Sequence, residues 1–303
     1  MKTRGYEGIQ DLYAMLDLLS EGGQVNAGTH YVHRGDLQWW LFYNDAPENA
    51  WHSNVRLWHE DDRLIGWALI SPEENAFDVF TAPELRGDAR EREMLEWATN
   101  QMDDLDFMET VWVAETDDVR TAWLEAHGFQ RRDRHFVNLV RSISDPLDAP
   151  ALPAGFQFRT SRGPEDAQLR SAASHGAFGS TRPFEEYWPR TLRFMQSPIY
   201  VPEHELFVVA PNGEVASYCI FWTDPLNKLG HFEPVGTHPN YQRLGLGKSL
   251  MLEAMRRLKS EGMTSVDLCT NDGNDAAIGL YESVGMRIKQ RLRTYWKAKS
   301  NTS

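Results

Sequence analysis

Hydrophobic and polar residues follow two different periods along the second half of the chain. Short runs rich in Val, Phe, Tyr and Trp, such as residues 205–210 and 215–222, have the pattern of buried strands, and a Pro-Asn-Gly turn joins these two. Residues 245–261 instead repeat their apolar positions at helical spacing. The alternation predicts an α/β fold on a mixed sheet. The expected strands cover 156–159, 205–210, 215–222, 230–237, 265–269 and 291–297, and the expected helices 164–177, 184–195, 245–261 and 275–284.

The first half of the chain contains a degenerate sequence repeat of the second half. Leu280-Tyr-Glu-Ser-Val-Gly-Met286 has a counterpart in Trp123-Leu-Glu-Ala-His-Gly-Phe129, at an offset of 157 residues. Pro239 and Pro83 correspond at nearly the same offset. A fixed offset between separate motifs indicates a duplicated domain. The copy is expected to contain strands over 55–59, 63–70, 76–81, 110–114 and 135–140, and helices over 89–102 and 119–126.

A proline-rich segment separates the two copies. Residues 144–154 contain three prolines and no periodic pattern, which is typical of a stiff linker. The sequence therefore predicts a first domain over 1–143, a linker over 144–154 and a second domain over 155–299. The 303 residues, 41% hydrophobic and 25% charged, have the length and composition of about two globular domains.

Charge is distributed unevenly between the halves. Residues 1–143 hold 27 Asp and Glu against 13 Lys and Arg, a net charge of −14, whereas residues 144–303 hold 17 against 18, a net charge of +1. An acidic half argues against nucleic acid as a partner and is compatible with a cationic substrate. No apolar run is long enough to span a membrane, and the histidines and the two cysteines form no zinc motif. We expect a cytoplasmic protein without a bound metal.

The strongest chemical signal is a glycine-bearing loop before the long helix. It reads Thr237-His-Pro-Asn-Tyr-Gln-Arg-Leu-Gly-Leu-Gly-Lys248. Its glycines let a ligand approach the backbone, and a helix start leaves N–H groups without partners, so the loop is suited to a phosphate or pyrophosphate. A Walker A loop would need glycine in place of Gln242, and a dinucleotide fingerprint would need glycine in place of Leu250. Neither pattern fits.

The loop resembles the acetyl-CoA signature of the GCN5-related N-acetyltransferases (GNAT). Gln242-Arg-Leu-Gly-Leu-Gly247 matches the pattern [QR]xxGx[GA], and the downstream segment from Asn274 to Gly285 matches the family's second motif. The resemblance is good from Gly155 to about Lys299 and degenerate in the first half. It implies two tandem GNAT-like domains, each with a mixed central sheet flanked by helices, and acetyl-CoA as co-substrate.

The resemblance also implies roles for individual residues. Asn274 would hydrogen-bond the cofactor arm, and Tyr281 would protonate or hydrogen-bond the leaving thiolate. Backbone groups of Val235, Gly236 and Thr237 would hold the pantetheine, and the loop would hold the pyrophosphate. The residues of the loop implied to bind the cofactor are Gln242, Arg243, Leu244, Gly245, Leu246, Gly247, Lys248 and Ser249, with the backbone from Arg243 to Ser249 on the pyrophosphate.

An amine acceptor must lose a proton, so a base is expected beside the cofactor. Glu233 and His231 are two residues apart on the expected strand, which places them on one face. Both match positions where family members carry a base; Glu233 is the first choice and His231 the second. A water chain, or a purely structural role for either side chain, stays open.

The first copy lacks the features that bind the cofactor. Glu91 stands in place of Gly247, Asp117 in place of Asn274 and Leu124 in place of Tyr281, and a carboxylate at position 91 would repel a pyrophosphate. We expect no acetyl-CoA there; the domain is structural, shapes the acceptor pocket or binds another small molecule. Aromatic residues between positions 175 and 200 are candidates for the acceptor pocket or for core: His175, Phe178, Phe184, Tyr187, Trp188, Phe194 and Tyr200.

These observations predict an N-acetyltransferase that moves an acetyl group directly to a primary amine of a small molecule, in a ternary complex. The alternatives are a protein or peptide N-acetyltransferase and a non-catalytic acyl-CoA-binding or sensor protein. A pure scaffold is disfavoured by the intact signature. The two domains are expected to pack as a pseudo-dimer, so a monomer fits.

Overall fold

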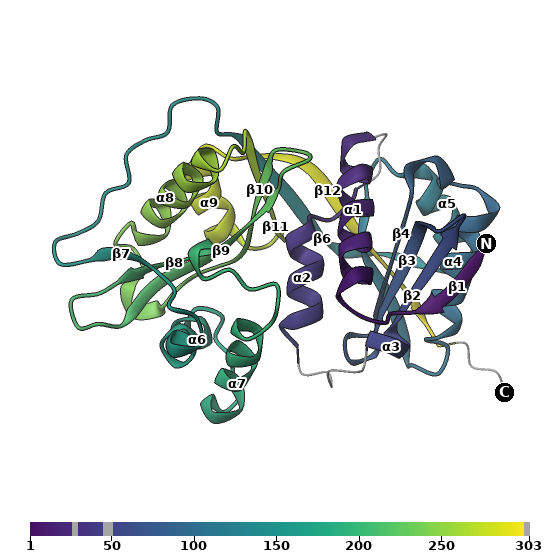
Figure 1. Ribbon diagram of the computed structural model, residues 1–303, viewed down its shortest axis with the longest axis horizontal. Helices are drawn as coiled ribbons and strands as arrows, with labels where there is room; N and C mark the ends of the chain where they lie inside the picture. Colours follow the sequence, from purple (N-terminus) through teal and green to yellow (C-terminus); the bar gives the residue numbers. More distant parts are fainter. Residues whose placement is uncertain (26–29, 45–50, 300–303) are drawn as a thin grey trace.

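The computed structural model describes residues 1–25, 30–44 and 51–299. The strands of this part of the chain form one 12-stranded sheet in the order β1-β2-β3-β4-β5-β12-β6-β11-β10-β9-β8-β7, with helices on both faces (Figure 1). The mixed α/β architecture predicted from the sequence is confirmed. The first half contains β1 (Lys2–Gly5), α1 (Ile9–Val25), α2 (Arg34–Phe42), α3 (Trp51–Asn54), β2 (Val55–Glu60), β3 (Arg63–Ser71), β4 (Ala76–Thr81), α4 (Ala89–Asn100), β5 (Phe107–Ala114), α5 (Asp118–Ala126) and β6 (Gln130–Ser142).

Apart from the short helix α3, the second half repeats this order after a segment, residues 144–154, that has neither helix nor strand. Paired elements such as α5 and α9, or β6 and β12, start 157 residues apart, which agrees with the offset found in the sequence. The second half contains β7 (Gln157–Thr160), α6 (Ala167–Ala177), α7 (Phe184–Met195), β8 (Glu205–Val209), β9 (Val215–Asp224), β10 (Leu229–Thr237), α8 (Leu246–Ser260), β11 (Ser265–Asn271), α9 (Asp275–Ser283) and β12 (Arg287–Ala298).

Each half gives its last strand to the other half. β12 pairs with β5 on one side and with β6 on the other, and β6 pairs with β11. The last strand of the second half therefore lies between two strands of the first, and the reverse holds for β6. Backbone hydrogen bonds run without a break through the middle of the sheet, so the two sequence halves are joined by more than the linker.

The elements missing from the sequence prediction lie at the start of the chain, at β1, α1, α2 and α3. Helix α2 has a clear local cause: the His33 side chain accepts from the backbone N–H of Gly35, and the Asp36 side chain accepts from that of His33 at 2.9 Å. This is a capping box with an unusual His at the N-cap, which sequence rules based on Ser, Thr, Asp and Asn overlook.

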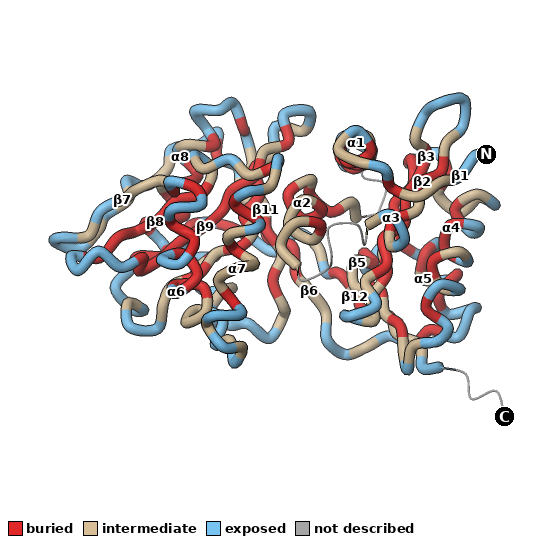
Figure 2. The backbone as a smooth tube through the Cα atoms, turned by 60° about the horizontal axis from the view of Figure 1, so that its bottom comes forward, coloured by how far each residue is buried: buried red, intermediate tan, exposed pale blue. Residues whose placement is uncertain are grey.

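One hydrophobic cluster ties the halves together. It unites Leu12 of α1, Leu37 of α2, Phe194 of α7 and Trp222 of β9. Helix α2 lies between the two halves (Figure 2), and its buried Leu37 and Leu41 belong to this cluster. Separate clusters fill the space under α8 and α9 in the second half and under α4 and α5 in the first. The interdomain cluster holds the two halves in a fixed relation around the space between them.

Candidate active site

A slot opens between two neighbouring strands of the second half. β10 and β11 are parallel and paired only from Leu229 to His231, after which both strands continue without pairing to each other. A bulge at Glu233–Pro234 bends β10 where the strands part. The indole Nε1 of Trp222 donates to the carbonyl of Glu233 at 2.8 Å and fixes the bulge. An extended ligand can therefore lie between the strands and meet backbone groups that the sheet leaves unused.

The start of α8 adds a set of free donors beside the slot. Gly245 caps the helix with φ of 75°, a left-handed conformation that glycine adopts without strain. In the described part of the chain, the six N–H groups from Arg243 to Lys248 make no backbone hydrogen bond. A Cβ on Gly247 would already lie 3.2 Å from Leu280, so the backbone is closely packed there. This concave array of N–H groups at a helix N-terminus can bind an anion.

Ser249 is not part of that array. Its N–H is used in the bond to the carbonyl of Gly245, and its hydroxyl donates to the carbonyl of Ala151 in the linker. The contact between Ser249 and the pyrophosphate, which the loop motif implies, would therefore have to form without a free backbone N–H at this residue. Its role in the structure is to hold the linker along α8, together with Lys259, whose amine donates to Ser144.

Asn274 and Tyr281 belong to the helix that follows β11: Asn274 caps α9 and Tyr281 lies within it. Asn274 is the exposed N-cap of this helix, and its side-chain oxygen accepts from Ala277 at 3.2 Å, which leaves the amide NH2 for a ligand. Tyr281 is 8% exposed. Burial and the nearby charge of Glu233 raise the pKa of its phenol, so the hydroxyl stays protonated and can donate. The charge of Glu233 is thus near enough to act on the Tyr281 hydroxyl.

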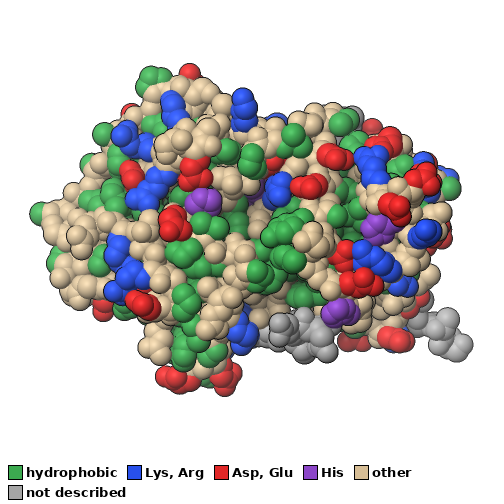
Figure 3. Space-filling view, in the orientation of Figure 1, with side chains coloured by type: hydrophobic (Ala, Val, Ile, Leu, Met, Phe, Trp, Pro, Cys, Tyr) green, Lys and Arg blue, Asp and Glu red, His purple; other side chains and the backbone are tan. Residues whose placement is uncertain are grey.

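Glu233 occupies the junction between the slot and a larger cleft. The cleft has a volume of about 950 Å³ and is lined by both halves, with Trp39 and Trp40 of α2 and Glu233 and Pro234 of β10 among its lining residues. Hydrophobic side chains gather between the two halves on the face seen in Figure 3. Burial, and after it the charge of Asp36, raises the pKa of Glu233 to about 7. Near pH 7 this carboxyl can therefore accept and release a proton.

His231 does not reach the cleft. Its ring is 1% exposed and lies between two carboxylates: Nε2 is 3.0 Å from Asp36 of the first half, and Nδ1 is 2.7 Å from Asp267 of the second. Burial opposes protonation, but the two carboxylates outweigh it and hold the pKa of His231 well above its usual value. His33 stacks on the ring at 4.8 Å. Both nitrogens are occupied, which does not fit the role of base considered for His231; the residue joins the halves.

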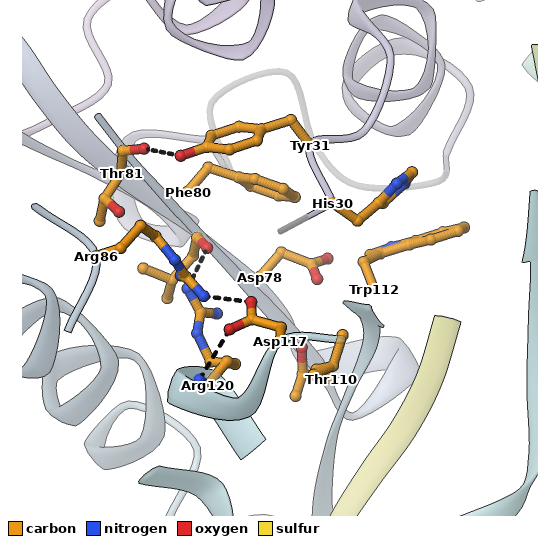
Figure 4. Close-up of a pocket in the computed structure, with 12 residues that line it drawn as sticks. His30, Tyr31, Asp78, Phe80, Thr81, Arg86, Thr110, Trp112, Asp117 and Arg120 are labelled. Atoms are coloured by element: carbon orange, nitrogen blue, oxygen red, sulfur yellow. Dashed lines mark hydrogen bonds and ion pairs between the residues drawn. The ribbon is translucent and has the colours of Figure 1, made fainter. Parts of the chain in front are cut away.

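In the first half, charged side chains occupy the equivalent place; Figure 4 shows three of them, Arg86, Asp117 and Arg120, at the small pocket that remains. Glu91 accepts from the backbone N–H of Gly87 at 2.5 Å and from Arg120 at 2.8 Å, and it also pairs with Arg86. Arg86 pairs in addition with Asp117. Burial opposes ionisation of Glu91, but the two arginines outweigh it and lower its pKa. The carboxylate is thus ion-paired in the place of a bound anion, and the remaining cavity measures only about 20 Å³.

The aromatic residues divide between cleft and core. Phe178 and Tyr187 line the cleft, as do Trp39 and Trp40 from the first half. Phe194 is fully buried in the interdomain cluster. Two further cleft residues, Arg170 of α6 and Tyr218 of β9, were not identified from the sequence because neither lies near a motif.

Two other site types have no support in the described residues. No group of three or more His, Cys, Asp and Glu side chains there is arranged to hold a metal ion, and none of the described helices combines the length and apolar character needed to cross a membrane. Burial raises the pKa of both cysteine thiols, Cys219 and Cys269, which disfavours a thiolate nucleophile.

Comparison with known proteins agrees with this geometry. Residues 173–286 match the model of the acetyltransferase (GNAT) family. A mycothiol acetyltransferase of Thermobispora bispora is 28% identical over 241 residues, covering 76% of this chain and 78% of the relative. Another, from Streptomyces coelicolor, is 26% identical over 292 residues, covering 90% and 87%.

Solved structures show the same arrangement over the whole chain. A tandem GNAT protein from the clavulanic acid biosynthesis pathway aligns with a TM-score of 0.69 at 17% identity, covering 100% of this chain and 99% of the other. A GCN5-related N-acetyltransferase from Sphaerobacter thermophilus aligns with a TM-score of 0.67 at 18% identity, covering 98% and 95%. The layout, with a degenerate first half, is similar to that of mycothiol synthase. Residues 173–286 thus lie in a GNAT acetyltransferase domain, and the chain is an N-acetyltransferase with the tandem GNAT layout.

Proposed function

We propose that the protein transfers the acetyl group of acetyl-CoA to a primary amine of a small molecule, directly and in a ternary complex. The observation that carries the proposal is the slot between β10 and β11 with the six unpaired N–H groups of Arg243 to Lys248 at its end. A thioester with a long arm and a pyrophosphate needs this combination of an extended groove and an anion site.

In this proposal the cofactor is bound mainly by backbone. Val235, Gly236 and Thr237 face the pantetheine arm, and the N–H groups from Arg243 to Lys248 hold the pyrophosphate. The side chain of Gln242 donates to the carbonyl of Thr237 at 3.3 Å and so connects these two segments. Asn274 contributes its free amide NH2. Ser249 bonds the start of α8 to the linker through the carbonyl of Ala151.

Glu233 serves as base and Tyr281 as acid. The amine nitrogen attacks the thioester carbonyl while the Glu233 carboxylate takes a proton from it, and a backbone N–H at the bulge stabilises the oxyanion. The carbon–sulfur bond then breaks, and the Tyr281 hydroxyl gives its proton to the thiolate. A pKa of about 7 for Glu233 suits a base that must accept the proton near neutral pH.

The acceptor site is the interdomain cleft. Its volume of about 950 Å³ lies in the range of small-molecule pockets, which run to about 1,000 Å³, and both halves enclose it. This favours a small acceptor over a peptide. The names of the relatives make a mycothiol-related amine the first compound to test.

The first half, residues 1–143, is proposed to bind no acetyl-CoA and to form one wall of the acceptor site. Glu91 and Asp117, paired with Arg86 and Arg120, fill its slot. Residues 155–299 then carry the cofactor and the chemistry, with 144–154 as linker. The joined sheet gives a monomer with two pseudo-equivalent halves.

Calorimetric titration of acetyl-CoA into the full chain tests the proposal. We expect one site per chain, abolished by Gly247→Glu, which puts a carboxylate among the N–H donors. Gln101→Glu, which adds the same charge on the exposed end of α4, is the matched control and should bind normally. Release of CoA thiol on addition of amines then measures transfer.

The outcomes separate the alternatives. Binding without thiol release for any amine would indicate an acyl-CoA sensor, and release only with peptides would indicate a peptide acetyltransferase. Two sites per chain would contradict the assignment of the first half. Absence of binding to the unmodified protein would refute the proposal as a whole.

A further inference from the structure

Two buried hydrogen-bond donors on the second-half wall of the cleft lack partners. Nη2 of Arg170 and the hydroxyl of Tyr218 make no hydrogen bond to any described residue, although the two side chains are only 1% and 0% exposed. The guanidinium carbon of Arg170 lies 4.5 Å from the centre of the Tyr218 ring, so the two groups are neighbours. Both residues line the cleft. A buried donor without a partner is unfavourable, and folded proteins keep few of them.

The structural duties of Arg170 are met by its other nitrogens. Nε donates to Glu205 at 2.9 Å and Nη1 donates to Ser174 at 3.2 Å. Glu205 is also held by the hydroxyl of Tyr200 at 2.6 Å. The ion pair between Arg170 and Glu205 therefore does not use Nη2. Burial raises the pKa of Tyr218 well above its usual value, so its hydroxyl also remains a donor.

This donor pair lies next to the proposed site of acetyl transfer. Tyr218 is paired with Gly236 in the register of β9 and β10, and a Cβ on Gly236 would come within 2.7 Å of the Tyr218 ring. The ring thus lies against the strand just beyond the bulge. Arg170 is also close enough for its charge to be one of those that act on the Glu233 carboxyl.

We propose that Arg170 and Tyr218 bind an oxygen atom of the acceptor, a carboxylate or carbonyl oxygen carried near the amine. The inference rests on the proposed function, because it is the amine's approach to Glu233 that brings this oxygen to the donor pair. A guanidinium N–H and a phenol hydroxyl on neighbouring side chains are suited to such an oxygen. Acceptors of this class are amino acids and aminoacyl compounds, in preference to plain alkylamines.

Three amines with one aromatic body test the assignment. Phenylalaninamide carries a carbonyl, phenylalanine carries a carboxylate and phenethylamine carries neither. Tyr218→Phe removes one hydroxyl and leaves the packing in place. We expect the preference for an oxygen-bearing amine over phenethylamine, measured as a ratio of kcat/KM values, to fall about 10-fold in this variant. If the ratio falls for phenylalaninamide, the bound oxygen is that of a carbonyl; if it falls for phenylalanine, it is that of a carboxylate.

The control is Tyr295→Phe, which removes a hydroxyl of the first-half core that contacts Thr121 and lies outside the cleft. It should leave the ratio unchanged. A Tyr218→Phe variant in which all three amines lose activity equally would overturn the proposal, as would an unmodified protein without any preference for oxygen-bearing amines.

Binding measurements distinguish a failure of this inference from a failure of the proposed acetyl transfer. If no amine releases thiol, calorimetric binding of the same three amines decides: tighter binding of an oxygen-bearing amine, lost in Tyr218→Phe, supports the donor pair although the transfer reaction is wrong. Equal or absent binding overturns it. A melting temperature of Tyr218→Phe at or above that of the unmodified protein establishes that the variant is folded.

Discussion

Replacing Glu233 by Gln should remove the contribution of this one group to the pH dependence of the free energy of unfolding, between about pH 4.5 and 7. The pKa of Glu233 is raised from 4.5 to about 7 in the folded chain. The difference is 7 − 4.5, or about 2.5 units, and each unit corresponds to 1.36 kcal/mol, so ionising this group at high pH destabilises the fold by at most about 3 kcal/mol. Solvent in the cleft will reduce the value.

The sign follows from proton binding. Between pH 4.5 and 7 the folded state holds the Glu233 proton more tightly than the unfolded state does. The contribution of this group to stability is therefore fully present below pH 4.5, declines as pH rises and is lost once pH has passed about 7. Gln cannot ionise. Relative to the unmodified protein, Glu233→Gln should gain stability steadily from pH 4.5 to 7 and then level off.

Urea unfolding at half-unit intervals from pH 4 to 9 measures this difference. Glu282→Gln, an exposed change on α9, is the matched control and should show no such trend. The same carboxyl should control catalysis: kcat/KM of the unmodified protein should rise with pH up to about 7 and then level off, because only the carboxylate accepts a proton. A flat stability difference, or a rate profile without an inflection near 7, would refute the reasoning about Glu233.

Three further changes probe the cofactor side, the junction and the first half. Tyr281→Phe should lower kcat while acetyl-CoA still binds by calorimetry, since only a proton donor is lost; equal turnover would exclude it as the acid. His231→Gln should cost about 3–5 kcal/mol in urea unfolding, because two buried carboxylates lose their shared cation. With a folded pKa well above 6.5, His231 stabilises fully below pH 6.5 and loses this effect as pH rises through that higher pKa, so the cost should shrink at alkaline pH; a constant cost would contradict the pairing. Glu91→Gln should destabilise by a similar amount without creating an acetyl-CoA site, and a second site by calorimetry would show that the carboxylate alone had blocked it.

Much of the fold follows from local pattern and duplication. The helix expected over 184–195 and the strand expected over 76–81 coincide with α7 and β4, and the repeat of 157 residues predicted the order of the elements. Strand exchange could not be predicted, because β6 and β12 descend from one repeated sequence pattern and either strand suits either place. Pairing within or between halves then depends on the tertiary packing of the whole chain.

The candidate site, like the fold, could be predicted only where local sequence motifs determine it. The N–H groups at the start of α8 and the position of Tyr281 follow from motifs with fixed spacing. The role of His231 does not, because its partner Asp36 is 195 residues away and nothing near either residue links them. Period-2 geometry places His231 and Glu233 on one face of β10. The bulge and the packing of α2 then bury one of them between carboxylates and leave the other at the cleft.

The two halves illustrate what an active copy requires once the fold is shared. Both slots arise from the same feature, a parallel pair that separates after a few residues: β10 from β11, and β4 from β5, where only Ala76 and Glu109 are paired. The open slot of the second half has glycine at position 247 and unused N–H groups. In the first half, Glu91 at the equivalent position brings its own anion, and Arg86 and Arg120 neutralise it. Because the charges in this first-half slot are paired with one another, they stabilise the fold rather than bind a ligand. The first half instead contributes aromatic residues to the wall of the cleft in which Glu233 lies.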